Sequence, residues 1–258
     1  MMHMMTAAQG NLPMNKASSE ILVFTPTPNE FKAVRNHVAG SSFQNFIVKV
    51  VESGPGKINA AFKMAAEIIP RLAAGRRPAF VMGAGTSGSL SVELVSGEMV
   101  VSSSAVISDW RMENDSERFH GDYGLFSYHK LEPRVVDEIA LNCPDPTVIK
   151  LMGQLEKAGF KRGRMMTSDT FVAGPRHKLN LGREFKCLAC DMESGAYAYA
   201  AQHLLGGLPW FNLRVVADTL DESLHDYFSK EIDMVDVLGT KTAQALTILD
   251  ELLLNDGP

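Results

Sequence analysis

Residues 79–88 read AFVMGAGTSG, a short apolar run followed by three glycines in the spacing GxGxxG. We expect residues 79–82 to form a buried strand and the glycines to form a turn. The same spacing occurs in dinucleotide-binding proteins, where the third glycine lies in a long helix. Here residues 89–95 are followed at once by Ser96-Gly97 and a new strand, which leaves no room for that helix. The stretch therefore predicts a glycine-rich turn whose backbone lies close to a small ligand.

Strand-like and helix-like segments alternate on both sides of this stretch. The expected strands are 21–25, 46–51, 79–82, 98–102, 164–168, 187–192 and 210–217, and the expected helices are 29–38, 57–74, 132–142, 147–158, 193–204 and 231–254. Because no linker interrupts the alternation, we predict a single α/β domain over residues 19–258 with helices on both faces of the sheet. Residues 1–18 are rich in methionine and without periodicity, and we expect a disordered extension.

The composition excludes several classes of protein. The 258 residues are 45% hydrophobic and 21% charged, and the net charge is −5. A nucleic acid or an anionic membrane does not attract such a chain, and no apolar run is long enough to span a bilayer. Three cysteines suit a reducing compartment, so we expect a cytoplasmic protein. Neither a metal nor a cofactor is expected, because no histidine or cysteine spacing fits a metal site.

Three carboxylates follow predicted strands. Glu30 comes after the first strand, Glu193 lies where a strand ends and a helix begins, and Asp218 ends the strand that contains Arg214. In α/β sheets, ligands bind at the carboxyl ends of strands. A carboxylate there can accept both hydroxyls of a vicinal diol, although the helix dipole alone also favours an acid at the position of Glu193. Together the three acids favour acid–base chemistry on a small polar molecule.

Six segments resemble, in this order, the nucleoside phosphorylase/nucleosidase superfamily. They are ILVFTPTPNEF, ESGPGKINAAF, VMGAGTSGSL followed by SGEMVVSS, TSDTFVAG, CDMESGA and RVVAD, and they lie between about Glu20 and Leu253. Within the superfamily they are most like the 5′-methylthioadenosine/S-adenosylhomocysteine nucleosidases. The resemblance implies a mixed central β-sheet flanked by helices on both faces.

The resemblance also implies a role for each residue of a candidate site. In the nucleosidases the glutamate after the first strand activates water, which corresponds to Glu30, and the aspartate corresponding to Asp218 protonates the purine. The implied substrate-binding residues are Thr86, Ser87 and Gly88 beside the ribose, Phe171 and Val172 around the purine, Met192 and Glu193 on the ribose, and Arg214. An acid at Asp218 must keep its proton near neutral pH, which we expect burial to favour.

The chain departs from the family pattern in two places. Ala217 stands where the family has a serine before the aspartate, so one hydrogen bond that orients Asp218 is missing. The 5′ subsite is expected around Arg118 to Phe126 and partly from a second subunit, which implies a homodimer.

The leading hypothesis is hydrolysis of the N-glycosidic bond of adenine nucleosides such as 5′-methylthioadenosine or S-adenosylhomocysteine, with release of adenine. One alternative is a phosphate-dependent purine nucleoside phosphorylase, which forms larger homo-oligomers. The segment 25–30 argues against it, because its two prolines lack N–H donors and Glu30 repels phosphate. The other alternative is a non-catalytic nucleoside-binding or storage protein, which predicts loss of one or more of the three carboxylates.

Overall fold

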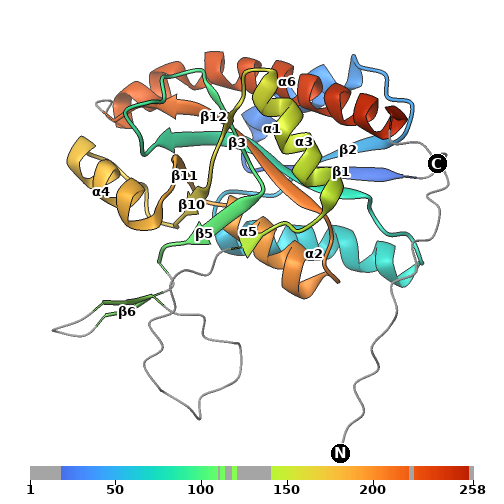
Figure 1. Cartoon of the computed structure of the whole chain (residues 1–258), viewed down its shortest axis with the longest axis horizontal. Helices are drawn as coiled ribbons and strands as arrows, with labels where there is room; N and C mark the ends of the chain where they lie inside the picture. The colour runs from blue at the N-terminus through green and yellow to red at the C-terminus, as the bar shows by residue number, and fades with distance from the viewer. Residues whose placement is uncertain (1–18, 110, 114–117, 121–140, 221–223, 256–258) are drawn as a thin grey trace, which may run out of the picture.

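A mixed sheet carries helices on both faces in the part of the chain that the computed structural model describes, which is residues 19–109, 111–113, 118–120, 141–220 and 224–255 (Figure 1). Its strands are β1 (Glu20–Thr25), β2 (Ile47–Glu52), β3 (Phe80–Ser89), β4 (Met99–Ser102), β5 (Ser104–Ile107), β8 (Leu141–Asn142), β9 (Lys161–Arg162), β10 (Met165–Thr167), β11 (Ala189–Asp191) and β12 (Trp210–Asp218). A separate hairpin pairs β6 (Arg111–Glu113) with β7 (Arg118–His120). The expected α/β fold with a mixed central sheet is confirmed.

The strands β3 and β12 form the centre of the sheet. They pair in parallel, and the order along the main path is β8-β5-β10-β11-β3-β12-β4-β9, with β1 paired to β3 and β2 paired to β1. Every residue of β12 is buried. Its apolar run is typical of a strand that is covered on both faces.

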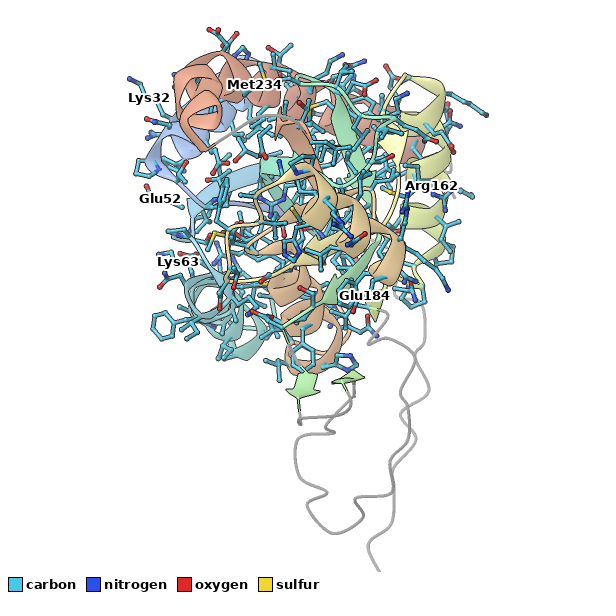
Figure 2. The ribbon with its side chains drawn as sticks, turned by 90° about the vertical axis from the view of Figure 1, so that its left-hand side faces the viewer. Lys32, Glu52, Lys63, Arg162, Glu184 and Met234 are labelled. Atoms are coloured by element: carbon cyan, nitrogen blue, oxygen red, sulfur yellow. The ribbon has the colours of Figure 1, made fainter. Side chains whose placement is uncertain are left out.

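The helices lie in two layers (Figure 1). They are α1 (Pro28–Ala39), α2 (Lys57–Ala73), α3 (Pro146–Lys157), α4 (Pro175–Phe185), α5 (Ser194–Tyr199), the π-helical turn η1 (Ala200–Leu204) and α6 (Leu224–Asn255). α1, α3 and α6 cover one face of the sheet, and α2 and α5 cover the other. Charged side chains such as Lys32, Lys63 and Glu184 point outward (Figure 2). None of the described helices combines the length and apolarity needed to cross a membrane.

The glycine-rich turn predicted after residue 82 is wrong, because β3 continues through all three glycines to Ser89. None of them has a positive φ. A Cβ on Gly83 would overlap the side chain of Asn212, and a Cβ on Gly85 would overlap the guanidinium group of Arg214, both from β12. Glycine is therefore needed here to make room for polar side chains of the neighbouring strand, and not for a turn.

Other segments also differ from the sequence prediction, among them the short strands β5 and β9, which were not expected. Residues 175–185 form α4, where no helix was expected, because this segment buries only Lys178 and Phe185 and so lacks an apolar face. The helix expected over 132–142 is wrong at its end, where Leu141–Asn142 form β8. The described part of the chain does not include the other residues of this expected helix. It also leaves out the extension 1–18 and the side chains of the expected 5′ subsite at 118–126.

Candidate active site

Glu30 lies in the first turn of α1, directly after β1, and is 2% exposed. Its Oε2 accepts from the backbone N–H of Thr27 at 2.9 Å and from the Thr27 hydroxyl at 3.0 Å. Thr27 in turn caps the helix, so the pair forms a capping box. The other oxygen, Oε1, accepts from the backbone N–H of Thr86 in β3 at 2.7 Å. These bonds hold the carboxylate in one orientation between α1 and β3.

Glu193 lies between β11 and α5 and is also buried. Its Oε1 accepts from the backbone N–H of Gly56 at 2.8 Å, and its Oε2 lies 3.4 Å from Nη1 of Arg214. Burial raises the pKa of Glu193 to about 8, although Arg214 and the Gly56 N–H oppose this shift. The carboxyl group is therefore held where the chain turns into α2, in surroundings that favour its protonated form more than water does.

Arg214 is the buried cation behind this carboxylate. Its side chain is fully buried in β12, and Nε lies 2.7 Å from Oδ2 of Asp191 and 3.1 Å from the hydroxyl of Ser194. Burial opposes the charge, but Asp191 and Glu193 outweigh it and raise the pKa of Arg214. Its contacts fix Glu193 and Asp191, and the direct substrate contact implied by the resemblance stays a prediction.

Asp218 lies at the end of β12 and is 3% exposed. It accepts a hydrogen bond from the Nζ of Lys178, which projects from α4 and has no exposed surface. The same ammonium group donates to the backbone carbonyl of Thr219 at 2.7 Å. A Cβ on Gly88 would lie 3.0 Å from Oδ1 of Asp218, so β3 passes directly beside this carboxylate. Sequence reasoning missed Lys178, since a buried lysine carries no periodic signal.

Of the two residues expected around a purine, Val172 shares an apolar cluster with Cys190, whose thiol is affected by the charge of Asp218. Val172 is buried in a small apolar cluster, whereas Phe171 is 42% exposed. The other buried members of the cluster are Leu90, Val106, Met166, Phe185, Cys187 and Cys190. Burial, and then the charge of Asp218, raise the pKa of Cys190 to about 12. Both cysteines are free, and Cys190 presents an unreactive thiol next to the carboxylate.

The strand β3 connects the two parts of the site. Thr86 and Gly88 are partly exposed, and they lie next to Glu30 and Asp218, respectively. Ser87, between them, is buried and donates to the backbone carbonyl of Val215 at 3.3 Å. Glu30 and Asp218 thus lie directly beside β3, and Glu193 is linked to this strand through Arg214, whose guanidinium group lies against Gly85. We call the Glu30 and Glu193 side the sugar end and the Asp218 side the base end, after the parts of a nucleoside that the resemblance assigns to them.

A network of charges that sequence reasoning did not identify borders the sugar end. The Nζ of Lys57 pairs with Asp109 and lies 3.2 Å from Oδ2 of Asp169, and the backbone N–H of Lys57 donates to Asp169 at 2.9 Å. Lys57 is the first residue of α2, next to Gly56. The network therefore ties the start of α2 to the loop that leads to Phe171.

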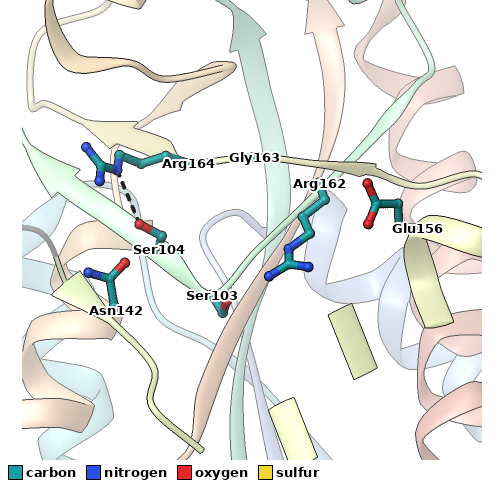
Figure 3. Close-up of a pocket in the computed structure, with 7 residues that line it drawn as sticks. All are labelled: Ser103, Ser104, Asn142, Glu156, Arg162, Gly163 and Arg164. Carbon is teal, nitrogen blue, oxygen red and sulfur yellow. Dashed lines mark hydrogen bonds between the residues drawn. The ribbon is translucent and has the colours of Figure 1, made fainter. Parts of the chain in front are cut away.

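A separate cavity of about 450 Å³ lies at the amino ends of β5 and β10 (Figure 3). Ser104 and Arg164 line it and are joined by a 3.2 Å hydrogen bond. The candidate residues lie instead where β1, β11 and β12 end. This cavity therefore does not belong to the site.

Comparisons with known proteins identify the family of the chain. The phosphorylase superfamily matches residues 20–253. A 5′-methylthioadenosine/S-adenosylhomocysteine nucleosidase of Chromohalobacter salexigens is 28% identical over 199 residues, 73% of this chain and 76% of that protein. One from Buchnera aphidicola is 22% identical over 80% of each chain.

Solved structures share the fold. A 5′-methylthioadenosine/S-adenosylhomocysteine nucleosidase of Helicobacter pylori superposes with a TM-score of 0.68 at 19% identity, covering 92% of this chain and 100% of that chain. A structure described as futalosine hydrolase of the same organism gives 0.67 at 20% identity, covering 91% and 98%. The chain belongs to the phosphorylase superfamily, as the sequence segments predicted.

Proposed function

We propose that this protein hydrolyses the N-glycosidic bond of adenine nucleosides, such as 5′-methylthioadenosine or S-adenosylhomocysteine, and releases adenine. The observation that carries the proposal is the gathering of buried Glu30, Glu193 and Asp218 around β3. The curated relatives, which are named as nucleosidases, support it. We expect the protein to act in the cytoplasm as a homodimer.

Each carboxylate has one task in this reaction. Glu30 takes a proton from the water that attacks C1′, and Glu193 accepts hydrogen bonds from the ribose hydroxyls. Asp218 gives a proton to N7 as the C1′–N9 bond breaks and its electron pair moves to the base. Acid and base groups placed in this way typically contribute about 10²- to 10⁴-fold each.

The contacts of Glu30 favour water over phosphate as the nucleophile. A phosphorylase must neutralise a dianion with convergent donors. Here the backbone N–H groups of Thr27 and Thr86 donate to the Glu30 carboxylate. A phosphate bound here would be repelled by the Glu30 carboxylate, which already accepts the hydrogen bonds of these two N–H groups.

The test is adenine release from 5′-methylthioadenosine by the wild-type protein with and without phosphate. We expect release without phosphate and free methylthioribose as the second product. Strict dependence on phosphate, with a sugar 1-phosphate as product, would identify a phosphorylase. Binding of adenine without any turnover would identify a binding protein.

A further inference from the structure

Lys178 is the unusual group of the base end. Lysine is almost never fully buried unless it is paired, and this side chain has no exposed surface. Other charged residues of the same helix, Arg176, Arg183 and Glu184, are exposed. Lys178 alone among the charged residues of α4 turns inward, where it contacts Asp218 and the carbonyl of Thr219.

We propose that Lys178 is a positioning residue of the base end, which holds one oxygen of Asp218 and stabilises the carboxylate that forms when Asp218 gives its proton to the departing base. The inference rests on the proposed function, because it takes Asp218 as the acid. It adds a residue that the resemblance to the superfamily did not supply.

The geometry assigns different tasks to the two oxygens of Asp218. Lys178 donates to Oδ2, whereas a Cβ built on Gly88 of β3 would lie about equally close to both oxygens, at 3.0 Å from Oδ1 and 3.1 Å from Oδ2. The ion pair with Lys178 contains the ionised form of Asp218, so Asp218 must first take up a proton on Oδ1. In the reaction this proton moves to N7 of the base, and the electron pair of the C1′–N9 bond moves to the base. Oδ2 keeps its hydrogen bond to Lys178 throughout.

The ammonium group matters most after the proton has left. A neutral carboxyl interacts weakly with a cation, whereas the new carboxylate interacts strongly with it in a buried site. Since this interaction grows along the reaction, it accelerates the chemical step and not only substrate binding. Lys178 also supplies the orienting hydrogen bond that Ala217 cannot make.

Two other ionisable groups that the structure describes near the pair, Cys190 and Asp191, do not replace Lys178. Cys190 of β11 stays a neutral thiol, since burial raises its pKa to about 12. Asp191 pairs with Arg214. Among the side chains that the structure describes, Lys178 is the cation in contact with Asp218.

Two substitutions separate the charge of Lys178 from its hydrogen bonds. Lys178→Gln keeps an N–H donor and removes the charge, whereas Lys178→Arg keeps the charge. The rate kcat for 5′-methylthioadenosine is measured from about pH 5 to pH 10 in both variants and in Lys49→Gln, a control at the half-exposed ion pair with Glu67. A nearby cation lowers the pKa of a carboxyl group, typically by about one unit or more.

We expect Lys178→Gln to lower the maximal kcat about ten-fold or more, because Asp218 becomes a weaker acid. The pH at which activity falls on the alkaline side should rise by about one unit or more. Lys178→Arg should keep this pH near that of the wild type, and Lys49→Gln should change nothing. An unchanged alkaline limit in Lys178→Gln would overturn the proposal, as would the same shift in Lys178→Arg.

A double variant covers the case in which Lys178→Gln does not fold. Lys178→Gln/Asp218→Asn leaves neither charge of the pair, and removing both partners is far better tolerated than removing one. Its kcat should equal that of Asp218→Asn, because Lys178 acts through Asp218, and a clearly lower kcat would overturn the inference. If the wild type itself releases no purine from any nucleoside, the proposed function has failed. If it does and the Lys178 variants behave like it, only the inference has failed.

Discussion

The sugar end and the base end are built differently. At the sugar end, Glu30 and Glu193 accept from backbone N–H groups of Thr27, Thr86 and Gly56, which belong to secondary structure or its immediate flanks. At the base end, the described partner of Asp218 is a side chain, and Phe171 is 42% exposed. The carboxylates of the first region are therefore held mainly by backbone donors, with Arg214 behind Glu193, whereas Asp218 of the second region is held by the side chain of Lys178.

This difference suggests how the two ends tolerate change. Donors that belong to the backbone cannot be removed by substitution, so the sugar end depends on the identity of its carboxylates. The base end depends on the charge at Lys178 and on which hydrogen bonds a base offers. The predictions below test this contrast.

The largest effect is expected at the sugar end, from Glu30→Gln. The carbonyl oxygen of glutamine can keep the capping box with Thr27, so α1 should begin at the same residue, whereas its NH2 group cannot accept from the N–H of Thr86. Glutamine cannot accept the proton of the attacking water, so kcat should fall about 10³-fold with little change in KM. Steady-state adenine release measures both.

The control for this variant is Glu156→Gln, on α3 beside the separate cavity of Figure 3. It removes the same charge far from the site along the sheet and should leave kcat unchanged. Near-normal turnover in Glu30→Gln would remove Glu30 from the mechanism and would show that the sugar end does not depend on the identity of this carboxylate.

The base end should discriminate between adenosine and inosine. The resemblance implies that Val172 offers its backbone N–H to N1 and its C=O to the 6-amino group of adenine. Both have the wrong polarity for the N1–H and O6 of inosine, and each unpaired buried group costs about 1–3 kcal/mol. We expect kcat/KM to be about 10²-fold higher for adenosine. Comparable values would show that Val172 does not frame the base.

Much of the molecule is predictable from its sequence. The alternation of apolar runs marks the strands, and Glu30, Glu193 and Asp218 fall at strand ends, which the structure brings together around β3. The ion pair of Lys178 is not predictable in this way. A lysine that turns inward leaves no apolar periodicity, and its partner is 40 residues away.

The glycines of β3 show a second limit. Their spacing is consistent with a turn, but what requires them is the size of the Arg214 and Asn212 side chains on β12. Such a constraint depends on strand register. Register is set by pairing between distant segments, which one sequence does not display.

A substitution in β3 tests this explanation. Gly85→Ala places a Cβ onto the Arg214 guanidinium and near Pro26, so we expect a loss of about 1–3 kcal/mol in the free energy of unfolding. The matched control is Gly153→Ala in α3, where a Cβ meets nothing within 4 Å. It should stabilise the helix by about 0.5–1 kcal/mol. Denaturant unfolding measures both, and equal effects would contradict the packing explanation.

The smallest effect concerns the pH dependence of binding at the sugar end. Burial raises the pKa of Glu193 to about 8, so we expect its carboxyl group to be mostly protonated at neutral pH when no ligand is bound. Ribose hydroxyls donate to the ionised form, so binding should release a proton below that pKa. Affinity should therefore increase as the pH rises through about 8 and become constant above it.

A carbon-linked adenosine analogue, which cannot be cleaved, gives the dissociation constant directly. For a carboxyl group that titrates near 8, we expect Kd at pH 7 to be about ten-fold higher than at pH 9. Glu193→Gln should bind more weakly and lose this dependence. The base end provides the internal comparison, since Lys178→Gln should leave the slope unchanged. A Kd that does not vary with pH in the wild type would mean that Glu193 is already ionised at neutral pH, held so by Arg214 and the Gly56 N–H.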